Sequence, residues 1–173
     1  MLSAEFAHAL AARAERLGGV LGRAVRWLAL GMVIVTFAVV VLRYFFNSGS
    51  IALQESIQWM HAGVFLLGAA WTLQQDGHVR VDVFYRTMTP HQQARVNLWG
   101  SLLLLAPVAL LILLTSAPYV WESWKVFEGS HETGGLPGVF VLKTLIPLTA
   151  LLLLLQALAE ALRNALILQA PRS

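Results

Sequence analysis

Long apolar blocks are the feature of this sequence that most limits what it can fold into. Blocks such as "WLALGMVIVTFAVVVL" and "LLLLAPVALLILL" contain no charged residue. They approach the ~18 residues at which an apolar run predicts a membrane-spanning helix. Only 12% of the 173 residues are charged, about half the usual share of a soluble domain. The sequence therefore predicts an all-α integral membrane protein.

Four transmembrane helices can be drawn within a membrane domain over residues 27–163. The predicted spans are about 27–46, 50–73, 96–121 and 139–162, each near the ~20 residues needed to cross a bilayer. Residues 1–26 have apolar positions at helical spacings with arginines between them, which favours an amphipathic helix on the inner membrane surface. A partly ordered basic tail is the alternative for that segment. Residues 164–173 form a short tail.

The arginines predict the orientation of these spans. Nine of them fall on one side of the four-span arrangement: Arg13, Arg16, Arg23, Arg26, Arg80, Arg86, Arg95, Arg163 and Arg172. The other side has only Arg43, Lys125 and Lys143. Cytoplasmic segments of membrane proteins are enriched in basic residues. We therefore expect a multi-pass membrane protein with both termini in the cytoplasm.

The second span contains a polar stripe. On a helix, Gln54, Gln58, His61, Phe65, Gly68 and Thr72 fall on one edge less than a quarter-turn wide. An unpaired polar group that faces hydrocarbon costs several kcal/mol. We therefore expect this edge to contact other helices, with Gln54, Gln58, His61, Gly68 and Thr72 as candidate interface residues.

His61 lies near the middle of the second span, where a histidine can serve as a haem ligand, a proton relay or a hydrogen-bonding group. The other histidines, His8, His78, His91 and His131, lie outside the predicted spans. Haem b between membrane helices usually needs two facing histidines, so we interpret His61 as a structural hydrogen-bonding residue. We expect no catalytic residue, metal site or cofactor in this chain. It contains no cysteine, and its net charge of +3 gives no reason to expect nucleic-acid binding.

Three charged residues lie at the outer ends of the predicted spans. Arg43 ends the first span, Glu55 begins the second, and Lys143 enters the fourth by a few residues. An interfacial pair of Arg43 with Glu55 is the simpler prediction, and contact of Glu55 with another protein is the alternative. Lys143 can extend outward or pair with Glu122, Glu128 or Glu132. Proline removes a helix hydrogen bond, so kinks are expected at Pro107 and Pro147.

The two longer loops differ in pattern. In "DGHVRVDVFYRTMTPHQQARVNLW", alternating valines predict an extended segment, and Pro90 predicts the start of a helix. The outer loop "FEGSHETGGLPG" has the composition of an irregular loop.

The order of "RYFFN", "FLLGAAWTL", "GHVRVDVFY" and "LPGVFVLKTLIPL" resembles the small membrane subunit of tripartite ATP-independent periplasmic (TRAP) transporters. In the loop motif the matching residues are Gly77, His78, Arg80 and Asp82. That family often has Trp-x-Glu-Glu before the second helix. Here Ala52 and Gln54 replace the tryptophan and the first acid, so Glu55 alone is retained.

The resemblance implies a scaffold subunit, in a bacterial inner membrane, of a sodium-coupled importer of organic acids or related solutes. Its partners would be a large elevator-type membrane subunit, which holds the sodium and substrate sites, and a periplasmic binding protein. Two alternatives are a haem-bearing membrane anchor of an oxidoreductase and the small subunit of a tripartite tricarboxylate transporter.

Overall fold

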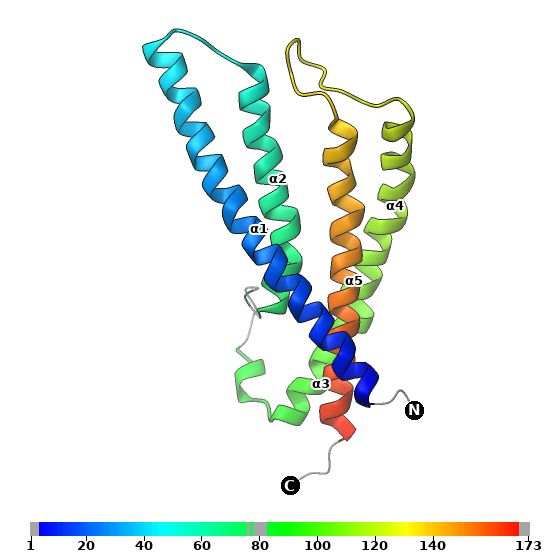
Figure 1. Cartoon of the computed structure of the whole chain (residues 1–173). Coiled ribbons are helices and arrows are strands. Elements are labelled where there is room, and N and C mark those ends of the chain that lie inside the picture. Colours follow the sequence, from blue (N-terminus) through cyan, green and yellow to red (C-terminus); the bar gives the residue numbers. More distant parts are fainter. Residues whose placement is uncertain (1–3, 76, 78–82, 170–173) are drawn as a thin grey trace.

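The computed structural model describes residues 4–75, 77 and 83–169, and their regular structure is entirely helical (Figure 1). This confirms the predicted all-α class for the described part of the chain. In chain order the elements are α1 (Ala4–Phe45), α2 (Ile51–Gln74), the 3₁₀ turn η1 (Tyr85–Thr87), α3 (Pro90–Gly100), the π-helical turn η2 (Ser101–Leu105), α4 (Ala106–Lys125) and α5 (Val139–Gln169).

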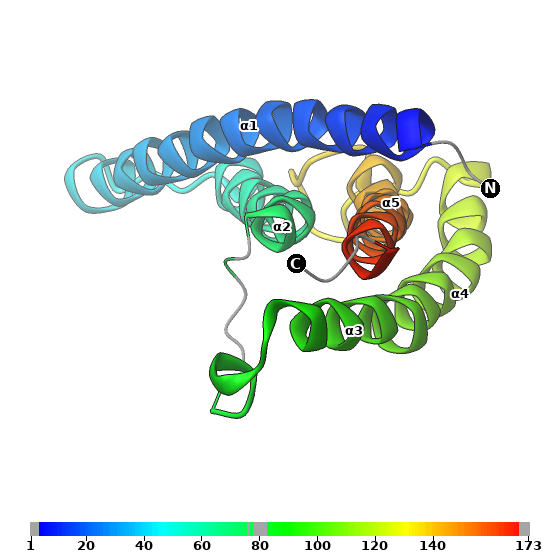
Figure 2. The same ribbon diagram turned by 90° about the horizontal axis from the view of Figure 1, so that it is seen from below.

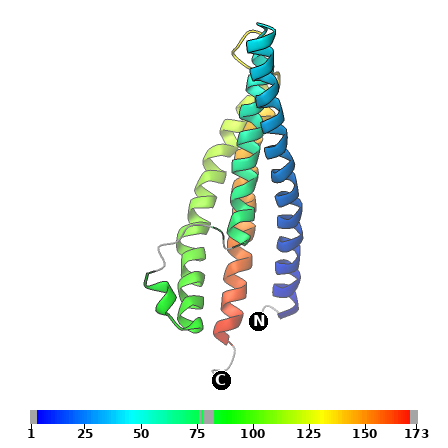
Figure 3. The ribbon, with the colours of Figure 1, turned by 90° about the vertical axis from the view of Figure 1, so that its left-hand side faces the viewer.

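The helices form two neighbouring hairpins. Two views at right angles show α2 and α5 between α1 and α4 (Figures 2 and 3). The α1–α2 loop (46–50) and the α4–α5 loop (126–138) lie at one end of the bundle, here named the loop end (Figure 1). Helix α1 begins and helix α5 ends at the opposite end, here named the terminal end. The first and last helices thus start and finish on the same side of the bundle.

Within the described residues, three helices are long and apolar enough to cross a membrane: Arg16–Phe45, Pro90–Lys125 and Val139–Gln169. These match the first, third and fourth predicted spans. Helix α2 has 24 residues, but Gln54, Gln58 and His61 reduce its hydropathy. The second span therefore stays a prediction, and so does the cytoplasmic orientation of the termini.

The N-terminal segment differs from the expectation of a separate amphipathic helix over residues 1–26. From Ala4 the helix continues into the first span without a break, through Gly18-Gly19, for 42 residues. A helix of that length measures about 63 Å, roughly twice the hydrocarbon thickness of a bilayer. The glycines do not interrupt it, because Gly18 lies against Gln74 and Gly22 against Trp71 of α2. This packing outweighs the low helix propensity of glycine.

Small residues form the contacts between helices. The buried apolar residues are almost all alanines: Ala70, Ala94, Ala109, Ala150, Ala157, Ala159 and Ala161, with Val120. No large side chain among the described residues is fully buried, whereas many leucines, valines and phenylalanines are exposed, including Phe37 at 69%. Small residues let helix backbones approach closely, and large apolar residues then face lipid or a partner.

The third predicted span begins where Pro90 indicated. The Thr89 hydroxyl accepts a hydrogen bond from Gln92 N (3.4 Å), and the Gln92 side chain accepts one from Thr89 N (2.9 Å). This capping box starts α3. Ahead of Pro107 the helix widens into η2, in which Ala106 N donates to Ser101 O. Since Pro107 has no N–H and its ring crowds the carbonyl four residues earlier, a local change of helix geometry is expected there.

We predict opposite effects of alanine at two neighbouring glycines of α1. A Cβ atom at Gly22 would lie 2.7 Å from the Trp71 ring, whereas one at Gly19 would meet nothing within 4 Å. Gly22→Ala should lower stability by ~1–3 kcal/mol through overpacking, and Gly19→Ala should raise it by up to ~1 kcal/mol through helix propensity. Thermal unfolding followed by circular dichroism in detergent measures both. Equal effects of the two variants would contradict the close contact of α1 with α2.

Candidate functional site

The polar stripe of α2 is divided between two environments. Gln54, Gln58 and His61 are exposed in this chain, and Phe65 is 70% exposed. The His61 and Phe65 rings lie beside each other, with 6.5 Å between their centroids. Among the described residues, these side chains make no hydrogen bond or ring contact with another helix. If protein covers this part of the stripe, the covering surface must come from a partner protein.

The remaining stripe residues face α1 or lie near it. Gly68 is buried, and a Cβ atom there would touch Val25 of α1 at 3.9 Å. Thr72 is half-buried. Helix α1 thus covers this edge of α2 toward the terminal end and leaves it open toward the loop end. Gly68 is therefore part of a contact within the subunit, not of the exposed surface. We name the open part, formed by Gln54, Gln58, His61 and Phe65, the α2 polar edge.

Glu55 connects α2 to the α4–α5 loop. Its Oε2 accepts a hydrogen bond from Leu136 N (2.6 Å), and its Oε1 accepts one from the Ser130 hydroxyl. Ser130 N also donates to Leu136 O (3.1 Å), so the carboxylate closes a compact turn of the loop. Gly135 permits this approach, because a Cβ atom there would lie 2.8 Å from Glu55 Oε1. One side chain of the first hairpin thus fixes the loop of the second.

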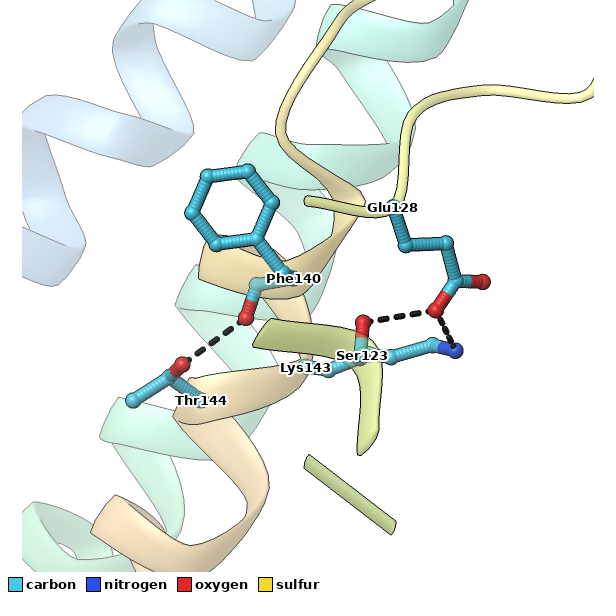
Figure 4. Close-up of polar contacts among 5 residues, drawn as sticks. All are labelled: Ser123, Glu128, Phe140, Lys143 and Thr144. Atoms are coloured by element: carbon cyan, nitrogen blue, oxygen red, sulfur yellow. Dashed lines mark hydrogen bonds and ion pairs between the residues drawn. The ribbon is translucent and has the colours of Figure 1, made fainter. Parts of the chain in front are cut away.

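A second carboxylate, Glu128, joins the same loop to α4 and α5 (Figure 4). Glu128 Oε2 lies 2.5 Å from Lys143 Nζ and accepts a hydrogen bond from the Ser123 hydroxyl (2.6 Å). The Lys143 ammonium also lies 4.2 Å from the centroid of the Tyr119 ring, a distance suited to a cation–π contact. Of the three acids proposed as partners of Lys143, the structure selects Glu128.

These contacts determine the charge state of Glu128. Hydrogen bonds from Lys143 and then from Ser123 lower the pKa of the Glu128 carboxyl below its usual value, against a smaller opposing effect of burial. The carboxylate therefore stays ionised under mildly acidic conditions, and the loop contact stays intact there.

Aromatic residues support the loop beside these carboxylates. The Trp124 indole N–H donates to the Thr144 hydroxyl (2.9 Å). The rings of Trp124 and Phe127 both pack edge-on against Phe140, at 4.6 and 5.7 Å between centroids. Loop, α4 and α5 therefore form one packed unit at the loop end.

The predicted pair of Arg43 with Glu55 is not formed. Arg43 is exposed near the end of α1, and the Glu55 carboxylate is already occupied by the α4–α5 loop. The sequence reading missed Ser130, Leu136 and Ser123. Only Gly134-Gly135 gave a signal, since paired glycines indicate a tight turn. That signal did not reveal which side chain the turn surrounds.

The loop motif lies mostly outside the described residues: His78, Arg80 and Asp82 are not described. Gly77 is exposed, and its N–H donates to Thr72 O (2.9 Å) just after α2. Among the described residues, no group of three or more histidine or acidic side chains could hold a metal ion.

Comparison with known proteins adds two findings. A family model described as "Tripartite ATP-independent periplasmic transporters, DctQ component" matches residues 32–166. The C4-dicarboxylate TRAP transporter small permease protein DctQ of Vibrio cholerae serotype O1 is 26% identical to this chain over 106 residues. That alignment covers 61% of this chain and 45% of the Vibrio protein, so the chain spans less than half the length of this relative. No solved structure gives a significant match.

We predict that Glu55→Ala releases the α4–α5 loop. Amide exchange at Leu136 should accelerate by about tenfold, because a hydrogen bond to a charged acceptor is lost. Hydrogen exchange followed by mass spectrometry measures this, with Arg43→Ala as the matched control at the same end of the bundle. If the Arg43 variant accelerates exchange as much as the Glu55 variant, the assignment of Glu55 to the loop is wrong.

We also predict how the loop responds to pH. Because the pKa of Glu128 is lowered in the folded chain, its stabilising effect is complete above the pKa of an unfolded glutamate. It is lost as the pH falls through the lowered folded value. Exchange protection of residues 126–138 should therefore persist through the usual titration range of glutamate and fall only at more acidic pH. Glu128→Gln should remove that acid-dependent step, and a step of unchanged size in this variant would contradict the assignment.

Proposed function

Because the chain belongs to the DctQ component family of tripartite ATP-independent periplasmic transporters, we propose that it is a non-catalytic scaffold for the large transport subunit. The complex would be a sodium-coupled importer of organic acids, fed by a periplasmic binding protein. In this proposal the sodium and substrate sites and the elevator motion belong to the large subunit, and this chain provides a fixed frame.

The α2 polar edge carries the proposal. Gln54, Gln58 and His61 are exposed within the chain, on a helix that packs between α1 and α5 (Figure 2). Facing lipid, these groups would each lack hydrogen-bond partners at a cost of several kcal/mol. A second membrane protein with polar side chains at this edge would provide such partners. The large subunit is the partner that the family offers.

In this proposal α2 also crosses the membrane, which brings the number of crossings to four. With three crossings, the start of α1 and the end of α5 would lie on opposite faces of the membrane, whereas both lie at the terminal end of the bundle (Figure 1). An even number of crossings agrees with that arrangement. The many arginines at the terminal end support a cytoplasmic position for it. The α4–α5 loop would then lie on the periplasmic side.

The periplasmic loop end is then the surface nearest to the binding protein. Its exposed groups include Glu122, Lys125, His131 and Glu132, and the contacts of Glu55 and Glu128 hold the loop that presents two of them. The name of the Vibrio relative mentions C4-dicarboxylates, and this supports an organic acid as substrate class.

We predict that Gln58→Leu combined with His61→Leu weakens copurification of this chain with its large subunit. Loss of two interfacial hydrogen bonds should cost ~1–3 kcal/mol, or about tenfold or more in affinity. The measurement is the fraction of large subunit retained on a tagged small subunit after detergent extraction, together with sodium-dependent uptake of a dicarboxylate.

The matched control is Thr36→Leu combined with Thr115→Leu. Both threonines are exposed, and both hydroxyls donate to backbone carbonyls of their own helices, Met32 O (2.7 Å) and Leu111 O (2.8 Å). They need no partner, so this variant should copurify like the unmodified chain. Normal transport by a large subunit that lacks this chain would refute the scaffold proposal.

A further inference from the structure

One face of α1 changes from basic to apolar at Trp27. Figure 2 shows α1 along one outer edge of the bundle. On this helix Arg23, Arg26, Trp27 and Leu30 line a hollow of about 360 Å³, here named the α1 hollow. Trp27 is 72% exposed, Leu30 is 48% exposed, and both arginines are exposed. The hollow therefore has two cationic side chains toward the terminal end and an apolar surface toward the loop end.

The two guanidinium groups of the α1 hollow have no acidic partner among the described residues. Neither Arg23 nor Arg26 forms an ion pair there. Arg26 Nε donates to Gly22 O (3.1 Å), one turn earlier in its own helix, which directs the guanidinium toward the terminal end. Side chains three residues apart on a helix are neighbours, and like charges at such positions repel each other. An anion beside both arginines would relieve that repulsion.

The spacing of charges along α1 places the α1 hollow at the edge of the hydrocarbon. The candidate span of α1 has no charged residue between Arg26 and Arg43. These two arginines are at most ~26 Å apart along the helix axis, close to the ~30 Å thickness of the hydrocarbon core. Trp27 is of a residue type that is enriched at membrane–water interfaces. Arg23 and Arg26 therefore reach the level of lipid phosphates, and Leu30 lies where the acyl chains begin.

We propose that the α1 hollow binds one anionic phospholipid, of the phosphatidylglycerol type, from the leaflet at the terminal end. The phosphodiester accepts hydrogen bonds from Arg23 and Arg26, because the planar guanidinium group suits paired phosphate oxygens. Trp27 and Leu30 contact the glycerol region and the beginning of an acyl chain.

The net charge of the lipid is what the hollow selects. A zwitterionic headgroup would bring an ammonium group close to two arginines, with no described acid beside them to receive it. An anionic headgroup meets only the attraction. Because all four lining residues belong to α1, the lipid would bind to this chain with or without the large subunit.

Competition between two lipids with the same acyl chains tests this proposal. The full chain in mild detergent is equilibrated with equimolar dioleoyl phosphatidylglycerol and dioleoyl phosphatidylethanolamine. Native mass spectrometry then counts each lipid, both on the chain alone and on its complex with the large subunit. The unmodified chain should bind phosphatidylglycerol about tenfold more than phosphatidylethanolamine. Its melting temperature should rise as phosphatidylglycerol is added.

Two double variants with the same loss of charge separate the α1 hollow from the rest of the helix. Arg23→Gln combined with Arg26→Gln should reduce the preference for phosphatidylglycerol to about one. Arg13→Gln combined with Arg16→Gln is the matched control, because both arginines are exposed on the same helix. They lie ~15 Å or more beyond Arg26 along the helix axis, so the control should keep the preference.

Equal binding of the two lipids by the unmodified chain overturns the proposal. An equal loss of the preference in both double variants also overturns it, because it would indicate a general effect of charge. A third contrary result is release of phosphatidylglycerol when the large subunit binds, which would mean that an acidic segment of that partner occupies the hollow. Displacement of the lipid by excess inorganic phosphate would mean that the arginines bind a free anion instead.

Discussion

A polar side chain within a membrane must have a partner, and in the proposed arrangement of four crossings the chain leaves that requirement unmet along the loop-end half of α2. Gln54, Gln58 and His61 are exposed in the chain by itself. Closer to the terminal end the same helix edge is covered, because Gly68 packs against Val25. The edge of α2 is therefore covered within the subunit toward the terminal end and uncovered toward the loop end. An incomplete membrane surface of this kind suits a protein whose role is to hold another one.

The rest of the architecture keeps that surface in place. Glycines of α1 let it approach Trp71 and Met60 of α2, which fixes the first hairpin. Glu55 then reaches across to the α4–α5 loop, and Glu128 with Lys143 joins that loop to the second hairpin. The contacts of the α4–α5 loop at one end and the small-residue contacts along the helices together join the two hairpins.

The sequence predicted the elements better than their contacts. Apolar length located three of the four predicted spans, and Pro90 marked the start of α3, since these signals are local. Lys143 was correctly limited to three acids, because all lie nearby in the chain. The partner of Glu55 was missed: Ser130 and Leu136 are 75 and 81 residues away, and no local pattern encodes such a distance. The unbroken α1 was missed because glycine pairs often end helices, whereas here Gly18 is a contact position against Gln74 of α2. The stripe of α2 is exposed in one part and covered by α1 in the other. Helical periodicity shows which residues share a face, but it does not show where another helix covers that face.

The most direct test of the scaffold account is the lipid accessibility of the α2 polar edge. The chain has no cysteine, so Gln58→Cys and His61→Cys each give a single site for a nitroxide label. Oxygen collision rates in lipid nanodiscs are compared with and without the large subunit. The account predicts high oxygen accessibility for the isolated chain and a clear fall in the complex. Equal, high accessibility in both would show that this edge faces acyl chains in the assembled transporter, and would contradict the account.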